Sequence, residues 1–519
     1  MPIDTPDWVR DAIFYQVFPD RFAASEGVVK PGPLEPWDAP PTLTGFNGGD
    51  LLGVAERLPY LEDLGINALY LTPVFASASN HRYHTYDYLA VDPLLGGDAA
   101  LRTLLDEAHR RGMRVILDGV FNHTGRGFWA FHHVLENGGS SPYRNWYHFD
   151  QAALDAGRPV RAYPGADSRG GATSDEPWIG QASPSSDGTA SRERLGYAAW
   201  WDLPALPKLN TDEPAVREYL FGVAEHWLRF GIDGWRLDVP EEIRDEAFWR
   251  EFRARCRAIR PDAYLVGEIW HVAPEWLAGD RFDALMNYPL AEAIMSFAGG
   301  DSLDLALVRN HHEYGSNVDR MDAGRFAARL LELDRAYDPA VVAVQLNLLG
   351  SHDAPRLRSV LGGDIAAVRL AILLQATLPG APSVYYGDEI GLEGGIDPDS
   401  RRAFPWDETR WETGLRTFVR DVLRLRTARR ALRRGSFSVL GSNGTVMAVE
   451  RRDGDERLVV AVNAGPEAGR LEIPLDPGGA TALEPLVVAG GAPVAMVAPA
   501  GDLAQLEIPG RSGGVLRVG

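Results

Sequence analysis

Three carboxylates stand out in the sequence because each ends a short apolar run of the kind that forms a strand. Asp238 ends Gly-Ile-Asp-Gly-Trp-Arg-Leu-Asp, Glu268 ends Tyr-Leu-Val-Gly-Glu, and Asp353 ends Asn-Leu-Leu-Gly-Ser-His-Asp. One carboxylic acid that protonates a leaving oxygen, with one carboxylate facing the carbon that is attacked, is the apparatus of glycosidic bond cleavage. The three groups can act together only if these segments are strands of one barrel, whose C-terminal ends meet at one rim.

Short β-rich runs alternate with segments of helical periodicity through most of the chain, which is typical of parallel βα units. The eight predicted strands are Ile13–Phe18, Ala68–Thr72, Arg114–Phe121, Gly234–Val239, Tyr264–Ile269, Ala284–Tyr288, Val344–Leu349 and Ser383–Tyr386. Helices are expected at Leu51–Leu64, Ala99–Arg111, Glu242–Ile259, Ile365–Leu378 and Arg416–Ala431. This alternation predicts an α/β fold, a (β/α)8 or TIM barrel, over residues 1–121 and 210–434.

Two regions break the alternation. Residues 122–209 are rich in Gly, Ser, Asp and Ala, and so long a loop is either disordered or functional. The aromatic residues around it favour an ordered insertion, a subdomain after the third strand. From residue 435 to 519 short apolar runs continue without a helical pattern, and Asp453-Gly454-Asp455 between two of them predicts a hairpin. We therefore expect a C-terminal antiparallel β-sandwich domain.

Composition limits the possible partners. The net charge of −20 argues against nucleic acid or an anionic membrane, both of which would repel the chain, and fits a neutral ligand. Cys256 is the only cysteine, so no internal disulfide is expected, and its helical spacing from Phe248 and Phe252 indicates an inert core thiol. Neither a signal peptide nor a run of about 18 apolar residues is visible, which predicts a cytoplasmic protein without a membrane span.

The motifs that contain the three carboxylates resemble those of the α-amylase family of glycoside hydrolases, and most closely its neopullulanase, cyclomaltodextrinase and maltogenic amylase group. Four blocks carry the resemblance: Asp118-Gly-Val-Phe-Asn-His123, Gly234-Trp-Arg-Leu-Asp238, Gly267-Glu-Ile-Trp-His271 and Leu349-Gly-Ser-His-Asp353. Three further segments match patterns of that group: Leu206-Pro-Lys-Leu-Asn210, Asn80-His-Arg-Tyr-His-Thr-Tyr-Asp-Tyr88 and Asp397-Pro-Asp-Ser-Arg401.

The resemblance implies a retaining hydrolase of α-1,4-glucosidic bonds in maltooligosaccharides, cyclodextrins or starch-like glucans, with some transglycosylation. Cleavage of α-1,6 bonds stays open. A 4-α-glucanotransferase or an α-glucosidase of the same family is the alternative, because sequence does not decide whether water or a sugar intercepts the intermediate. A binding subunit without activity is disfavoured, since such relatives typically lose a reactive carboxylate.

Roles for the carboxylates follow from the resemblance. Asp238 is the expected nucleophile, Glu268 the general acid and base, and Asp353 a third carboxylate that binds sugar hydroxyls. Arg236 stands two residues before Asp238, so it points to the same face of the strand and would keep Asp238 ionised. A structural Arg–Asp ion pair at the barrel mouth is the competing interpretation.

Other residues in the matched blocks are candidates for substrate binding. His123 and His352 are expected to bond sugar hydroxyls, and Tyr83 to stack against a sugar ring. Asp397 and Arg401 are candidates for holding the next sugar, with a surface ion pair as the alternative. The remaining candidates are Trp201 and His271 for binding, Trp200, Phe282, Met286 and Tyr288 for either the leaving-group side or the core, and Asp118 and Asn122 for structural support.

The chain departs from the group at two places. Members carry an N-terminal β domain through which they dimerise, whereas nothing before Ile13 could form one, so we expect a monomer or weak homo-oligomer. Relatives also build a calcium site from the loop after the first strand and a Gly-Gly-Asp. Gly48-Gly-Asp50 is present, but residues 20–29 lack most of the ligand residues. We expect no required cofactor and no tight calcium at this loop, although Asn122 matches a calcium ligand of other amylases.

Overall fold

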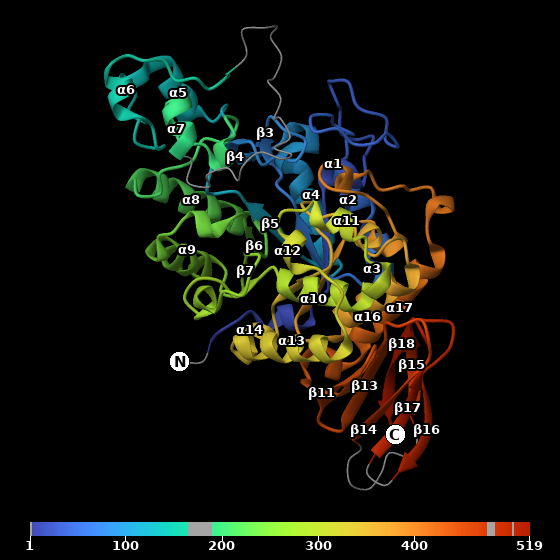
Figure 1. The fold of residues 1–519 in the computed structure, drawn as a ribbon. Coiled ribbons are helices and arrows are strands. Elements are labelled where there is room, and N and C mark those ends of the chain that lie inside the picture. The colour runs from blue at the N-terminus through green and yellow to red at the C-terminus, as the bar shows by residue number, and fades with distance from the viewer. Residues whose placement is uncertain (1–2, 165–188, 475–482, 501–502) are drawn as a thin grey trace.

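A parallel eight-stranded barrel forms the centre of the molecule (Figure 1). The computed structural model describes residues 3–164, 189–474, 483–500 and 503–519. The barrel strands are β1 (Phe14–Val17), β2 (Ala68–Leu71), β5 (Arg114–Gly119), β6 (Gly234–Leu237), β7 (Tyr264–Gly267), β8 (Ala284–Leu285), β9 (Leu346–Leu348) and β10 (Ala381–Tyr385). They lie in the order β8-β7-β6-β5-β2-β1-β10-β9, and a parallel bridge between Met286 and Leu346 joins the two ends. The predicted TIM barrel is confirmed.

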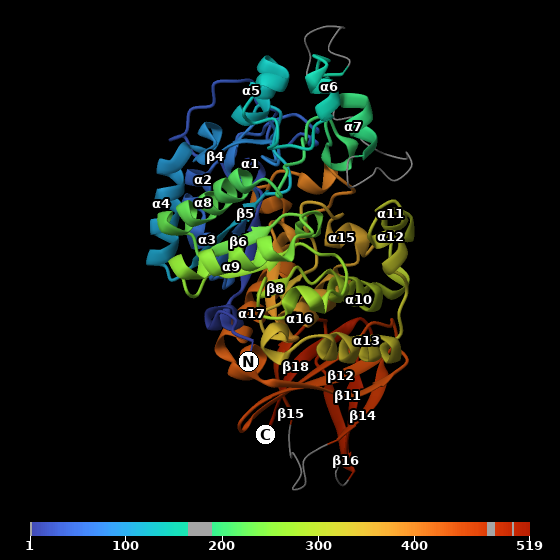
Figure 2. The ribbon, with the colours of Figure 1, turned by 90° about the vertical axis from the view of Figure 1, so that its left-hand side faces the viewer.

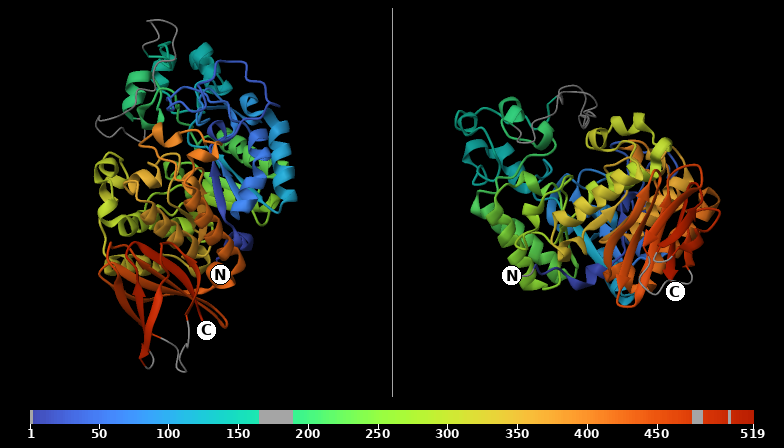
Figure 3. Two further views of the ribbon diagram at one scale, coloured as in Figure 1. Left: turned by 90° about the vertical axis from the view of Figure 1, so that its right-hand side faces the viewer. Right: turned by 60° about the horizontal axis from the view of Figure 1, so that its bottom comes forward.

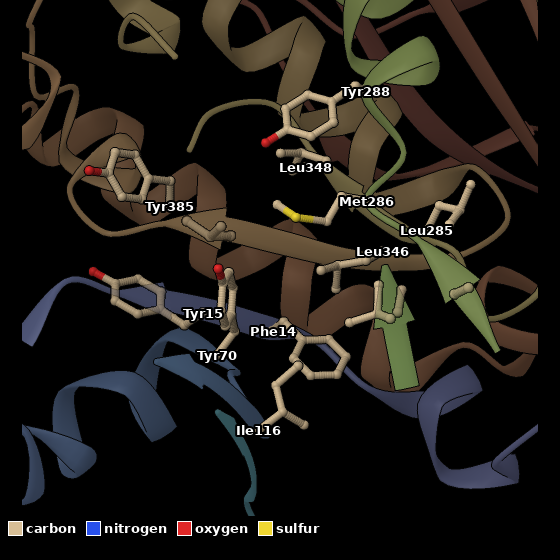
Figure 4. Close-up of a cluster of buried hydrophobic side chains, with 14 of the residues drawn as sticks. Phe14, Tyr15, Tyr70, Ile116, Leu285, Met286, Tyr288, Leu346, Leu348 and Tyr385 are labelled. Atoms are coloured by element: carbon tan, nitrogen blue, oxygen red, sulfur yellow. The ribbon is translucent and has the colours of Figure 1, made fainter. Parts of the chain in front are cut away.

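The barrel interior is a packed core, as is usual for eight strands. Figure 4 shows side chains from several strands meeting there, among them Phe14, Tyr70, Ile116, Leu346 and Leu348, and all of these are buried. Because both faces of each strand are covered, the strands read as continuous apolar runs in the sequence.

Helices surround the barrel, and their ends follow from local sequence. The main ones are α4 (Gly97–Arg110), α8 (Pro214–Phe230), α9 (Glu246–Ile259), α10 (Tyr288–Gly299), α13 (Ala323–Ala336), α16 (Ile365–Thr377) and α17 (Thr413–Ala428). Helix α9 begins later than predicted, because the Asp245 side chain caps it by accepting from the Ala247 amide. The predicted helix Leu51–Leu64 is instead two helices, α2 (Leu51–Glu56) and α3 (Leu58–Leu64), since Pro59 cannot continue a helix.

The chain leaves the barrel between β5 and β6 and forms an insertion with helices α5 (Trp129–Asn137), α6 (Gln151–Asp155) and α7 (Thr189–Leu195). Isolated bridges from His123 to Lys208 and from Tyr147 to Leu209 close its base. Residues 165–188 of the predicted insertion lie outside the described residues. A hairpin that we did not predict, β3 (Phe75–Ser77) with β4 (Thr85–Val91), lies at the same end of the molecule (Figures 1 and 2).

Two antiparallel sheets follow the barrel. The first contains β11 (Ser436–Asn443), β12 (Val446–Asp453), β13 (Glu456–Asn463), β18 (Ser512–Val518) and β15 (Leu483–Val488). The second contains β14 (Gly469–Pro474), β17 (Leu503–Ile508) and β16 (Ala495–Ala500). The predicted hairpin is confirmed, because β12 and β13 pair across Gly454, whose φ of 58° suits a glycine turn. Buried residues such as Val459, Leu471 and Leu506 pack together in this region.

The two additions to the barrel lie at opposite ends (Figures 1 and 3). The C-terminal sheets pack on helices α13 and α16, whereas the insertion grows from the C-terminal end of β5. The rim where the strands end therefore faces the insertion. Within the described residues, no helix is both long and apolar enough to cross a bilayer.

Candidate active site

The guanidinium of Arg236 is the centre of the candidate site. Its Nη1 lies 2.9 Å from Asp118 Oδ1 and 2.9 Å from Asp238 Oδ1, and its Nη2 lies 2.8 Å from Glu268 Oε1. Arg236 is fully buried. Carboxylates from the ends of three neighbouring strands thus surround one cation, and Asp238 and Glu268 converge at a single rim.

Strand geometry explains this convergence. Arg236 and Asp238 are two residues apart, so both point into the barrel, and Asp118 is the register partner of Arg236 on the neighbouring strand. Backbone bonds continue beyond the strand ends, because the Asp238 amide donates to Gly119 O (3.1 Å) and the Glu268 amide to Leu237 O (3.0 Å). The carboxylates therefore stand on the rigid part of the scaffold rather than on free loops.

Asp238 and Glu268 differ in how their second oxygen is held. Asp238 Oδ2 is buried and has no hydrogen-bond partner among the described residues. Glu268 Oε2 accepts from the Val239 amide (3.1 Å). Val239 has a φ of 35°, a left-handed conformation that costs a β-branched residue of order 1–3 kcal/mol. The turn that holds this strain also aims its amide at Glu268.

Burial controls the protonation of these groups. It raises the pKa of Glu268 to about 7, although Arg236 opposes the shift. Burial also raises the pKa of Asp238, again against Arg236, and the charge of Glu268 adds to the rise. Carboxylates this close to one another do not all ionise, so the pair shares a proton near neutral pH.

A hydrogen-bonded network joins Tyr83 and His352 to the centre. Gln16 Nε2 lies 3.0 Å from His352 Nδ1, which places the imidazole proton on Nε2. That nitrogen lies 2.6 Å from the Tyr83 hydroxyl and 3.1 Å from Asp353 Oδ2, while Tyr83 donates to Asp118 Oδ2 at 2.9 Å. Burial lowers the pKa of His352 to about 3, so the imidazole is neutral at working pH.

Arg401 ties two further candidates to the same place. Its Nη2 lies 3.2 Å from Asp353 Oδ1 and its Nη1 lies 3.0 Å from Asp397 Oδ1. The ion pair between Arg401 and Asp397 that the alternative interpretation expected is present. It is joined to the site, because Arg401 also donates from Nε to the His352 carbonyl at 2.8 Å. Burial alone would raise the pKa of Asp353, but His352 and Arg401 reverse the effect and bring it below its usual value.

His123 and the insertion form another wall. The His123 ring stacks on Trp200 with centroids 5.1 Å apart, and its buried Nε2 has no hydrogen-bond partner in the described part of the chain. Burial lowers its pKa to about 3, so it is neutral and suited to a sugar hydroxyl. Trp201, the residue after Trp200, has a left-handed backbone conformation with a φ of 54°. The carbonyl of Asn122 accepts from the Leu209 amide at 2.9 Å, which joins the third strand to the end of the insertion.

Not every candidate lies at the centre. The side chain of His271 is 61% exposed and its Nε2 lies 3.4 Å from Glu241 Oε1, which places it at the outer margin. Phe282 is buried between Trp249 and Trp276 and belongs to the core rather than the leaving-group side. Tyr288 is the first residue of α10 instead of a strand residue.

Met286 and Tyr288 belong to the buried cluster of side chains in Figure 4. Met286 Sδ lies 3.3 Å from Arg236 Nε, and the Tyr288 ring stacks on Trp270 with centroids 3.4 Å apart. Met286 therefore contacts the Arg236 guanidinium itself, and Tyr288 packs beside the strand end that holds Glu268.

Sequence reasoning missed several residues of this network, Gln16 and His311 among them. Gln16 is a buried polar residue inside the apolar run of β1, and that departure from the run could have revealed it. His311 contacts the Asp353 carbonyl through Nε2 (3.0 Å) and accepts from the Tyr314 amide at Nδ1 (3.2 Å). It lies in no motif, so nothing in the sequence distinguished it.

A parallel β/α barrel that gathers carboxylates around one arginine at the C-terminal rim has the construction of a glycoside hydrolase. The sequence profile for the alpha amylase catalytic domain matches residues 16–432. The chain belongs to the alpha-amylase family and is an enzyme of the glycoside hydrolase class.

Known proteins resemble the chain over most of its length. A cyclomaltodextrinase from Geobacillus thermopakistaniensis (strain MAS1) is 41% identical over 475 residues, which cover 91% of this chain and 72% of that protein. The solved structure of Ttha1563 from Thermus thermophilus is 47% identical with a TM-score of 0.86 and covers 99% of this chain and 100% of its own. The debranching enzyme from Nostoc punctiforme is 43% identical with a TM-score of 0.84, and each chain is covered in full.

Proposed function

We propose that the protein cleaves α-1,4-glucosidic bonds, and also α-1,6 bonds, in maltooligosaccharides and cyclodextrins with retention of configuration. The proposal rests on one arrangement: Asp238 and Glu268 both form ion pairs with the Arg236 guanidinium. The second oxygen of Asp238, Oδ2, has no hydrogen-bond partner among the described residues. The names of the relatives support the substrate class, because one is a cyclomaltodextrinase and another a debranching enzyme.

The reaction proceeds in two steps. Asp238 Oδ2 attacks the anomeric carbon while protonated Glu268 gives its proton to the leaving glycosidic oxygen, so a glycosyl ester forms as the C–O bond breaks. Glu268, now a carboxylate, then takes a proton from water, and the resulting attack on the same carbon releases Asp238. Two inversions give net retention. A sugar hydroxyl in place of water gives transglycosylation.

Neighbouring residues position the sugar. Arg236 holds one oxygen of Asp238 and leaves the other free to attack. His123, His352 and Asp353 bind hydroxyls, and Tyr83 stacks on the ring, as the resemblance suggests. Asp397 and Arg401 hold the next sugar, and Trp201 contacts the leaving-group side. These roles need no cofactor.

The pH profile should report the proton of Glu268. A general acid works only when protonated, and burial raises the pKa of Glu268 to about 7. We expect kcat/KM to fall about tenfold for each pH unit above that value. His123 and His352, with pKa values of about 3, should add no transition near neutrality. Initial rates on maltotriose across pH 4–10 measure the profile, and a constant kcat/KM up to pH 9 would contradict the assignment.

Product analysis tests the substrate class. Maltotriose, a cyclodextrin and an α-1,6-branched oligosaccharide should all give products shorter than the substrate by chromatography, with the α anomer appearing first by NMR. Dominant products longer than maltotriose would replace the proposal with a 4-α-glucanotransferase. Release of glucose alone from linear substrates, with the cyclodextrin intact, would replace it with an α-glucosidase.

We also propose a cytoplasmic location and a monomer or weak homo-oligomer. The single buried cysteine leaves no disulfide for an oxidising compartment to maintain. Gel filtration with light scattering tests the oligomeric state.

A further inference from the structure

The loop after β1 contains two buried aspartates, Asp20 and Asp50. The family resemblance implies calcium at this loop, and carboxylates are suitable calcium ligands. A divalent cation would need their oxygens to be available. The contacts of both side chains show whether they are.

Asp50 already has three protein donors. Its Oδ1 accepts from the Gly53 amide (2.7 Å), which caps helix α2. Its Oδ2 accepts from the Ser25 amide (2.9 Å) and from Lys30 Nζ (2.8 Å). The Lys30 side chain is only 11% exposed, and its ammonium also lies 3.4 Å from the Val28 carbonyl. The Lys30 ammonium, a cation of this chain, therefore contacts the Asp50 carboxylate directly.

Asp20 is occupied in the same way. It accepts from the amides of Asn47 (2.9 Å) and Gly48 (3.3 Å), and it lies 3.2 Å from Arg21 Nε and 3.5 Å from Arg82 Nη1. Arg21 also donates to the side-chain oxygen of Asn47 and to the Gly45 carbonyl. The residues present do not fit a calcium ion. Nowhere in the described ranges do three or more His, Cys, Asp or Glu side chains form a group that could hold a metal.

The identity of the cation at Asp50 is unusual for this chain. Lys30 and Lys208 are its only lysines, and arginine supplies every other permanent side-chain cation. Lysine offers a compact point charge, whereas arginine offers a wide planar fork. The backbone leaves little room here, since a Cβ on Gly53 would lie 2.4 Å from the Ala23 carbonyl. An ammonium brings the single positive charge to Asp50 with a smaller head group than a guanidinium.

We propose that the Lys30 ammonium occupies the cation position of this loop, so that the loop closes on α2 without a divalent metal. Lys30 neutralises the buried Asp50 from within the chain. The loop should then be indifferent to calcium, and removal of the ammonium should make it responsive.

Thermal unfolding of Lys30→Met tests the proposal. Methionine keeps most of the apolar stem and removes the charge, so Asp50 is left buried and uncompensated. We expect Tm to fall by about 5 °C and millimolar calcium chloride to restore at least half of that loss. The wild type should keep its Tm in both EDTA and calcium. Lys30→Arg keeps the charge but not the shape and should fall between the two.

Arg430→Met is the matched control, because it removes an exposed cation that lies 2.7 Å from Asp453 in the C-terminal domain; it should leave Tm and the calcium response unchanged. A wild type that loses Tm in EDTA or gains Tm in calcium overturns the proposal, as does a Lys30→Met protein with unchanged Tm or without a calcium response. If Lys30→Met does not fold, the wild-type measurements decide alone. Glucan hydrolysis below Tm should match the wild type, so this result is independent of the proposed function.

Discussion

Asp238→Asn is expected to lower kcat/KM for maltotriose by about 10⁵-fold, the scale seen when a covalent nucleophile is removed. An amide oxygen carries no negative charge and does not form the glycosyl ester. The side chain keeps its shape, so Arg236 and Asp118 stay in place. The measurement is the initial rate of product formation by chromatography, beside circular dichroism to show that the fold is intact.

Stability separates loss of chemistry from loss of fold. Asp238 competes with Asp118 and Glu268 for one guanidinium, so its neutralisation should leave Tm unchanged or raise it, as is common for active-site carboxylates. Asp262→Asn is the matched control, because Asp262 lies just before β7 at the opposite end of the barrel and its side chain is 46% exposed. It should keep full activity. An Asp238→Asn enzyme within tenfold of the wild type would contradict the nucleophile assignment.

A smaller side chain gives a second test of the same role. Asp238→Gly leaves space beside Arg236, and added formate or azide can occupy it as an external anion. We expect partial recovery of turnover on an activated glucoside, with azide giving a β-glycosyl product after a single inversion. The α-glycosyl azide would contradict the model of attack from the Asp238 side.

The barrel could be predicted from sequence because its signals are local. Each strand is an apolar run, and the spacing of two between Arg236 and Asp238 sets a common face. The prediction failed where a second local signal competed with the apolar run. The run Ala284–Tyr288 looks like one strand, but the Asn287 side chain accepts from the Leu290 amide and starts a helix.

The rest of the site depends on contacts between distant residues. Tyr83 and His352 meet across 269 residues, and Gln16 reaches His352 from the first strand. No spacing rule connects such positions, so only a resemblance could bring Tyr83 and His352 together. His311 shows the limit of that approach, because it holds the Asp353 backbone from a segment outside every matched block.

Glu268→Gln should have the second-largest effect, and its pattern should differ from that of Asp238→Asn. Glutamine can still accept the Val239 amide, but it has no proton to give. We expect kcat/KM for maltotriose to fall about 10³-fold, within the usual range for general acid catalysis. For an aryl glucoside whose leaving group needs no proton, formation of the ester should be nearly unaffected, so a burst of phenol should precede slow turnover.

The pH profile makes this test specific to the proton. With Glu268 replaced, the fall in kcat/KM above pH 7 should disappear, since the group that titrates is gone. Glu292→Gln is the matched control: burial raises the pKa of Glu292 to about 7 as well, but its carboxyl contacts Asn317 on α12 (Tyr314–Asn317) rather than Arg236. If Glu292→Gln abolishes the fall in kcat/KM above pH 7 and Glu268→Gln keeps that fall, Glu268 is not the general acid. Equal loss on maltotriose and on the aryl glucoside would instead make Glu268 a structural member of the Arg236 cluster, because only a proton donor distinguishes between leaving groups.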